Sequence, residues 1–213
     1  MLNSVVKMIL LLCLVFSSRS IFAVYPKTEE DFASLPPYCK ARLNYDTKAP
    51  QYKQWDQRMG KETFLHVHHY CAALFSLDLA RRDYEQRAFL LKTAISNIAY
   101  MEKRVPSSSR LLPEILMKKG MVLLMQGRDP EAMTAFLSSI QLNNRYSPSY
   151  MAIADYYISK KQYDEAMEIT EKGLKHVPKS KGLKRRKDKI NSKLEAQGGG
   201  SGDVIDNESQ QVD

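Results

Sequence analysis

The chain has 213 residues, a length that fits one domain or one short repeat array. Hydrophobic residues make up 44% and charged residues 26% of it, a balance that excludes collagen-like and wholly disordered proteins. The formal net charge is +8, but residues 175–193 alone hold nine Lys or Arg against one acid, so the excess is concentrated there.

Residues 1–23 have the layout of a secretory signal peptide. A basic start precedes an apolar run over residues 8–16, and small residues then lead to an expected cleavage after Ala23. The run is well short of the roughly twenty apolar residues that a spanning helix needs. A lipoprotein start at Cys13 is disfavoured, because the preceding Leu12 is bulky. The sequence therefore predicts an exported chain, periplasmic or secreted.

Two cysteines, Cys39 and Cys71, remain in the predicted mature chain. In an oxidising compartment an even pair is most simply a disulfide. Closing a loop of this length would stabilise the fold by about 3–4 kcal/mol. Two free thiols or a metal ligand remain as alternatives.

The region from 113 to 180 repeats itself with an offset of 34 residues. The offset places Gly120 over Ala154 and Ala132 over Ala166. Small residues at these positions would let paired helices approach closely. A 34-residue period is typical of solenoids built from helix-turn-helix units.

These residues resemble the tetratricopeptide repeat (TPR) family over about a third of the chain. The copy at 147–180 matches the family at Tyr150, Ile153, Ala154, Tyr157, Ala166, Gly173 and Pro178, and departs from it at Thr170. The copy at 113–146 keeps Leu116, Gly120, Leu123, Ala132, Phe136 and Ser139, and departs at Lys119 and Asn144, where an aliphatic residue and a proline are expected. The resemblance implies a non-catalytic scaffold or adaptor that binds a protein or peptide.

We expect the rest of the chain to extend this solenoid. Residues 62–106 read as a degenerate TPR-like helix pair, and 24–61 as an irregular N-terminal arm whose prolines mark turns. Residues 181–197 read as a basic capping helix, and 198–213 as a disordered tail. The predicted fold class is all-α, a short right-handed α-solenoid.

The resemblance also implies a partner-binding groove on the concave face. If the first helix of each pair has the same orientation as in the family, the residues that line this groove are Met117, Met121, Leu124, Met125, Met151, Asp155 and Ile158, with Glu114 beside them. Family members that grip a terminal carboxylate carry Lys and Asn where this chain has Met117 and Met121. A methionine-rich groove instead suits an apolar or amphipathic segment. The alternative is that the arm or a neighbouring helix covers these methionines.

The basic helix offers a second surface. Its cations, which could attract an anionic membrane or an acidic partner, are Lys184, Arg185, Arg186, Lys187 and Lys189. The alternative is a solvated cap that prevents further stacking of repeats. Nucleic acid is disfavoured, since no aromatic residues interleave the charges.

A histidine segment is the one stretch that resembles metal chemistry. His66, His68, His69 and Cys71 lie within one predicted helix start, and imidazole with thiolate would suit zinc or copper. No second motif supplies further ligands, so a metal-handling role is the alternative to the scaffold. Cofactor and catalytic motifs are absent from the sequence, and we expect neither a cofactor nor an enzyme.

Overall fold

The computed structural model describes residues 24–44 and 46–198, and in this part of the chain all regular secondary structure is helical. The predicted signal peptide and the tail from 199 onward lie outside the described residues. The helices are α2 (Glu29–Ala33), α3 (Pro37–Leu43), α4 (Pro50–Met59), α5 (Lys61–Arg82), α6 (Arg87–Arg104), α7 (Leu112–Met125), α8 (Asp129–Leu142), α9 (Ser147–Ser159), α10 (Tyr163–His176) and α11 (Lys181–Gly198).

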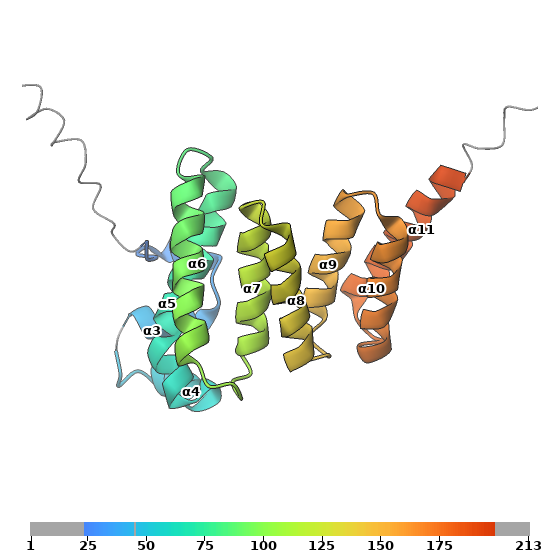
Figure 1. Cartoon of the computed structure of the whole chain (residues 1–213). Helices are drawn as coiled ribbons and strands as arrows, with labels where there is room; N and C mark the ends of the chain where they lie inside the picture. The colour runs from blue at the N-terminus through green and yellow to red at the C-terminus, as the bar shows by residue number, and fades with distance from the viewer. Residues whose placement is uncertain (1–23, 45, 199–213) are drawn as a thin grey trace, which may run out of the picture.

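The larger helices form consecutive pairs in chain order, as Figure 1 shows. Helix α5 packs on α6, α7 on α8 and α9 on α10, while α11 packs on both α9 and α10. Helix α9 also contacts α7, so α7, α9 and α11 follow one another along one side. We call α5, α7, α9 and α11 the inner layer and α6, α8 and α10 the outer layer. The predicted all-α solenoid of TPR-like helix pairs is confirmed.

Small residues lie where the paired helices come closest. A Cβ atom at Gly120 of α7 would meet the ring of Phe136 of α8, and one at Gly173 of α10 would meet Tyr150 and Leu183. Phe136, Tyr150 and Leu183 are fully buried. The repeat spacing therefore acts through packing, because each glycine makes room for a large side chain of the neighbouring helix.

Helix α7 joins two hydrophobic cores. Its Ile115 and Val122 pack in the first core, with α5, α6 and the N-terminal arm. Its Met117 and Leu123 pack in the second core, with α8, α9 and Leu183 of α11. The two cores thus share one helix and run continuously along the solenoid.

The N-terminal arm differs from the prediction, because it is helical and not irregular. Pro37 and Pro50 were read as turn residues, but each is the first residue of a helix, α3 and α4. Proline is favoured there, since the first helical N–H has no partner and the ring fixes a helical φ. The arm is held against α5 by the predicted disulfide between Cys39 and Cys71.

Further contacts fix the arm on α5. Arg42 donates to the main-chain oxygens of Phe64, at 3.1 Å, and of Leu65, at 2.9 Å. Tyr52 meets the ring of Phe64 edge-on, with ring centroids 4.9 Å apart. The arm is therefore part of the folded body and covers one side of the first helix pair.

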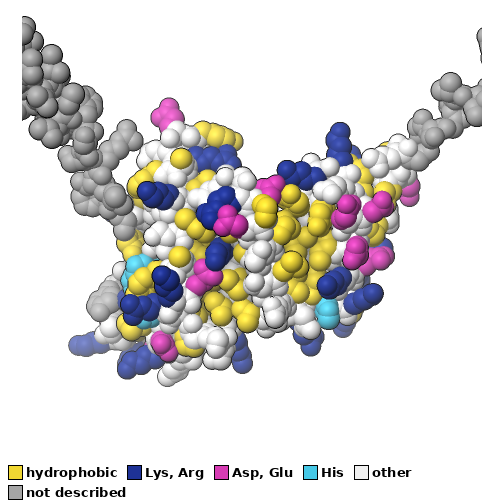
Figure 2. Space-filling view, in the orientation of Figure 1, with side chains coloured by type: hydrophobic (Ala, Val, Ile, Leu, Met, Phe, Trp, Pro, Cys, Tyr) yellow, Lys and Arg dark blue, Asp and Glu magenta, His cyan; other side chains and the backbone are white. Residues whose placement is uncertain are grey.

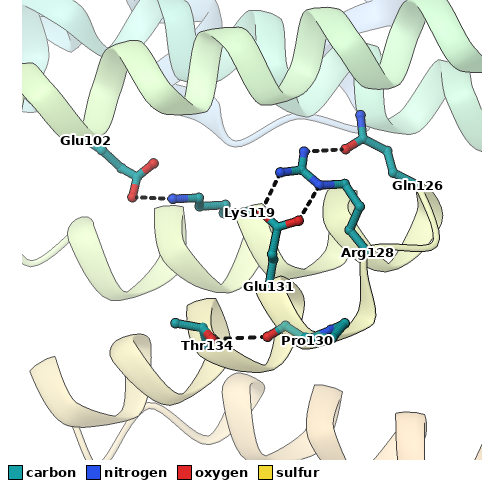
Figure 3. Close-up of polar contacts among 7 residues, drawn as sticks. All are labelled: Glu102, Lys119, Gln126, Arg128, Pro130, Glu131 and Thr134. Atoms are coloured by element: carbon teal, nitrogen blue, oxygen red, sulfur yellow. Dashed lines mark hydrogen bonds and ion pairs between the residues drawn. The ribbon is translucent and has the colours of Figure 1, made fainter.

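Lys119, which departs from the TPR pattern, forms an ion pair with a residue of the preceding helix. Its Nζ donates to Glu102 of α6 at 3.0 Å, and both side chains are partly buried (Figure 3). Nearby, Arg128 pairs with Glu131 at the start of α8. The preceding helix thus supplies the carboxylate that a lysine at an otherwise apolar position needs.

None of the described helices is both long and apolar enough to cross a membrane.

Candidate functional site

Four apolar side chains of the inner layer are not fully buried. We call this surface the inner groove and define it by Met121, Leu124 and Met125 of α7 and Ile158 of α9. All four side chains are partly exposed. Met121 and Leu124 rest on the second core, whereas Met125 rests on the first, so the groove lies over the seam between the two.

Met117 does not lie where the resemblance implied. Its side chain is only 7% exposed and packs in the second core. That core contains residues of α8, α9 and α11, so Met117 contributes to the packing of the helix pairs. It cannot line a groove without rearrangement of that core.

Helix α11 covers the far end of the predicted groove. Met151 lies against Gly182, where a Cβ atom would collide with the methionine sulfur. Asp155 accepts two hydrogen bonds from the guanidinium of Arg186, at 2.9 and 2.5 Å. Met151 is therefore packed against α11 on one side but stays partly exposed, and Asp155 is exposed but paired.

A polar end of the groove lies beside the arm. Glu114 and Lys118 stand one turn apart on α7, and Tyr70 of α5 donates to the Glu114 carboxylate at 3.0 Å. Burial, and then the charge of Glu114, raises the pKa of Tyr70 and of Tyr146. Burial lowers the pKa of Lys118, and Glu114 opposes that shift. A carboxylate, an amine and two phenols thus share one partly desolvated corner.

This corner opens into a small cavity of about 170 Å³ that α5, α7 and the α2–α3 junction line together. Asp78 and Arg81 of α5 add one charge of each sign to it. Sequence reasoning missed Lys118, Tyr70 and Tyr146. The four-residue step from Glu114 to Lys118 was visible in the sequence, but the approach of the other two depends on the tertiary fold.

The histidine segment has hydrogen-bond partners and lacks a ligand set. Tyr100 Oη and His66 Nδ1 share a hydrogen bond of 3.1 Å, and His69 Nδ1 donates to the side-chain Oδ1 of Asn97 at 2.8 Å. His68 Nδ1 donates to the Leu65 carbonyl at 3.1 Å, and burial lowers the pKa of His68 to about 4.

The remaining candidate ligand of this segment, Cys71, is bonded to Cys39. Within the described part of the chain, no three His, Cys, Asp or Glu residues are arranged to hold a metal ion. The metal-handling alternative therefore gains no support from the structure.

The five cations predicted on the basic helix divide into two groups. Arg186 pairs with Asp155 and Lys187 with Glu171, so these two brace α11 against α9 and α10. Lys184, Arg185 and Lys189 are exposed and have no ion pair among the described residues.

An apolar surface that sequence reasoning missed lies on the outer layer. Figure 2 shows apolar side chains gathered over α8 and its neighbours. Leu137 and Leu142 of α8 are 53% and 47% exposed. They lie outside the positions that the repeat pattern conserves, so the pattern gave no sign of them.

No protein-family model matches the chain, and its sequence matches no curated protein. Among solved structures, the chain is similar to the TPR domain of Sgt2 from Aspergillus fumigatus, with a TM-score of 0.47 and 18% sequence identity. The alignment covers 64% of this chain and 90% of that domain. The TPR-like arrangement described above rests on the helix pairs of this chain themselves.

Proposed function

We propose that the protein is a non-catalytic interaction scaffold, which holds an apolar or amphipathic partner segment in the inner groove. The observation that carries the proposal is the partial exposure of Met121, Leu124 and Met125 on the uncovered surface of α7. Flexible methionines adapt to varied apolar partners. Glu114 and Lys118, at the arm end of the groove, would give such a segment a direction.

The site of action that we propose is an exported one, periplasmic or secreted. The Cys39–Cys71 bridge supports it, since disulfides persist mainly in oxidising compartments. The apolar run at residues 8–16, followed by small residues, supports it independently. Fractionation of cells that express the full chain, with N-terminal sequencing of the product, tests it. A product that starts near Val24 in the exported fraction is expected, and an uncleaved chain in the cytoplasm would refute it.

The groove itself is tested by Met121→Glu combined with Met125→Glu. Two carboxylates would have to be desolvated when an apolar segment docks, so partner capture should fall at least tenfold, as expected for the burial of unpaired charges. Leu137→Glu is the matched control, because it adds the same charge to an exposed apolar position of the outer layer. Circular dichroism checks that all variants stay helical. Equal capture by the groove variant and the control would remove the inner groove from the proposal.

A second candidate function is peripheral attachment to an anionic membrane through α11. The observation that favours it is the exposed, unpaired set Lys184, Arg185 and Lys189. Flotation with vesicles that contain phosphatidylglycerol should show salt-sensitive binding, lost when these three become Gln. Absence of flotation at low salt would eliminate this function.

A further inference from the structure

A cavity separate from the inner groove lies beside the N-terminal arm. It has a volume of about 880 Å³ and lies where the end of α4 and the start of α5 face the connection between α6 and α7. Trp55, Met59 and Leu111 give it apolar walls, and Ser108 and Ser109 give it hydroxyl groups. We call it the arm cavity. It is far larger than a single small anion needs and can take several residues of a peptide.

The charged side chains of the arm cavity are mostly cations. Arg58, Lys61 and Arg110 line it, against the single acid Glu62. All three cations are exposed, and none forms an ion pair with another described residue. The Arg58 guanidinium lies 5.1 Å from the ring centroid of Trp55, an arrangement that orients the cation over an apolar wall. The cavity thus combines a positive rim with an aromatic surface.

The backbone adds positive potential at the same place. Helix α5 begins next to Gly60, and its start has no side-chain cap. Gly60, Lys61, Glu62 and Thr63 all line the cavity. The first amides of a helix lack intrahelical partners and carry the positive end of its dipole. An acidic ligand would therefore meet backbone donors as well as the three cations.

Tyr38 extends the aromatic wall of the arm cavity. It lines the cavity and is only 8% exposed. Its ring meets Trp55 edge-on, with centroids 5.6 Å apart. The two rings thus give the cavity a rigid apolar wall beside the cations.

We propose that the arm cavity binds an acidic peptide segment, in which carboxylate side chains alternate with apolar residues. The carboxylates would pair with Arg58, Lys61 and Arg110 at the rim, while the apolar residues would contact Trp55 and Met59. This goes beyond the proposed function, because the cavity and the inner groove share no lining residue. The scaffold would then hold two different segments, one apolar and one acidic.

The test uses Trp55, which is the only tryptophan of the chain and lines the cavity. The probe is a fluorescein-labelled peptide of alternating glutamate and leucine with an amidated C-terminus. Anisotropy of the label measures the dissociation constant, and quenching of Trp55 emission locates the binding. We expect saturable binding that quenches Trp55 and that weakens when the ionic strength rises from about 0.01 M to about 1 M, which shortens the Debye length from about 30 Å to about 3 Å.

The variant Arg58→Gln with Arg110→Gln should weaken binding about tenfold, as expected for two solvent-exposed ion pairs. The matched control Lys184→Gln with Arg185→Gln removes the same charge from the far end of the solenoid and should leave the dissociation constant unchanged. A peptide with lysine in place of glutamate should not bind.

Absence of binding, binding without a change in Trp55 emission, or equal binding by the two double variants would each overturn the proposal. Quenching by anionic vesicles but not by the acidic peptide would overturn it too, in favour of a membrane surface. Met121→Glu with Met125→Glu should bind the acidic peptide normally, so failure of the inner groove and failure of the arm cavity are distinguishable.

Discussion

Replacement of Gly120 by alanine should destabilise the protein, although alanine is the better helix former. A Cβ atom at this position would lie within 3.0 Å of three atoms of the Phe136 ring. The ring is fully buried, so it cannot move aside into solvent. Helices α7 and α8 would have to separate, or the ring would have to leave its preferred rotamer.

The magnitude follows from two opposing effects. Alanine gains about 1 kcal/mol of helix propensity over glycine. Overpacking of a buried site costs about 1–3 kcal/mol, and contact with three ring atoms favours the upper end of that range. We expect a net loss of about 2 kcal/mol in the free energy of unfolding. For a chain of this size, that loss lowers Tm by roughly 4–8 °C.

Urea unfolding followed by circular dichroism measures the effect. The comparison is Gly182→Ala, where the added Cβ would overlap the flexible end of Met151 and touch Arg186 at an ordinary contact distance. The loss there should stay below about 1 kcal/mol. In a double-mutant cycle, Gly120→Ala should cost about 1–2 kcal/mol less in a Phe136→Leu background. If Gly120→Ala raised the unfolding midpoint, or cost the same in both backgrounds, the close contact of α7 with α8 would not be what the glycine provides.

Three further predictions concern the covalent, ionisable and charged contacts. Cys39→Ala with Cys71→Ala should lower the free energy of unfolding by about 3–4 kcal/mol, measured in urea without reductant, because the 32-residue loop is no longer closed; an unchanged midpoint would contradict this. Burial lowers the pKa of His68 to about 4 in the folded chain, so as the pH falls the unfolded chain binds a proton at this residue first, and the free energy of unfolding decreases between about pH 6.5 and pH 4. His68→Gln should flatten the dependence of the unfolding free energy on pH in this window, and an unchanged dependence would exclude His68 as the cause. Glu102→Ala should lower the free energy of unfolding by about 1–3 kcal/mol in thermal melts, because it leaves Lys119 partly buried without its partner. The same change in a Lys119→Leu background should cost less than about 0.5 kcal/mol, and equal costs in the two backgrounds would show that the ion pair is not the source of the effect.

The repeat region could be predicted because its small residues recur at a fixed spacing of 34 residues. The steps from Gly120 to Ala154 and from Ala132 to Ala166 reflect the repeated close contact of two helices. Any sequence that builds such pairs must keep small residues at those points, so the helix pairs α7–α8 and α9–α10 could be read directly.

The N-terminal arm was harder to predict because proline has two opposite meanings. At Pro37 and Pro50 it begins a helix, yet the same residue type commonly marks a turn. The choice depends on whether the following residues can pack. Here they pack against α5, on a surface that only the folded first helix pair provides.

The candidate groove was predicted only in part, for a tertiary reason. Phase along a helix places Met121 and Met125 on one side of α7, but it does not say which neighbour covers a given residue. Met117 is buried within the second core, whereas Met151 packs against Gly182 of α11 and stays partly exposed. Tyr70 and Tyr146 approach Glu114 through tertiary contacts, which no local pattern encodes, whereas Lys118 follows Glu114 by one turn of α7.

The most direct test of the scaffold role is site-specific photo-crosslinking from the inner groove. A photoreactive amino acid replaces Met121 in one protein and Leu137 in a second, and both are irradiated in the cells that make the chain. The account predicts a discrete partner crosslinked from position 121, absent from position 137, and lost when Met125→Glu is added. The same products from both positions, or none from position 121, would contradict a partner-binding groove on α7.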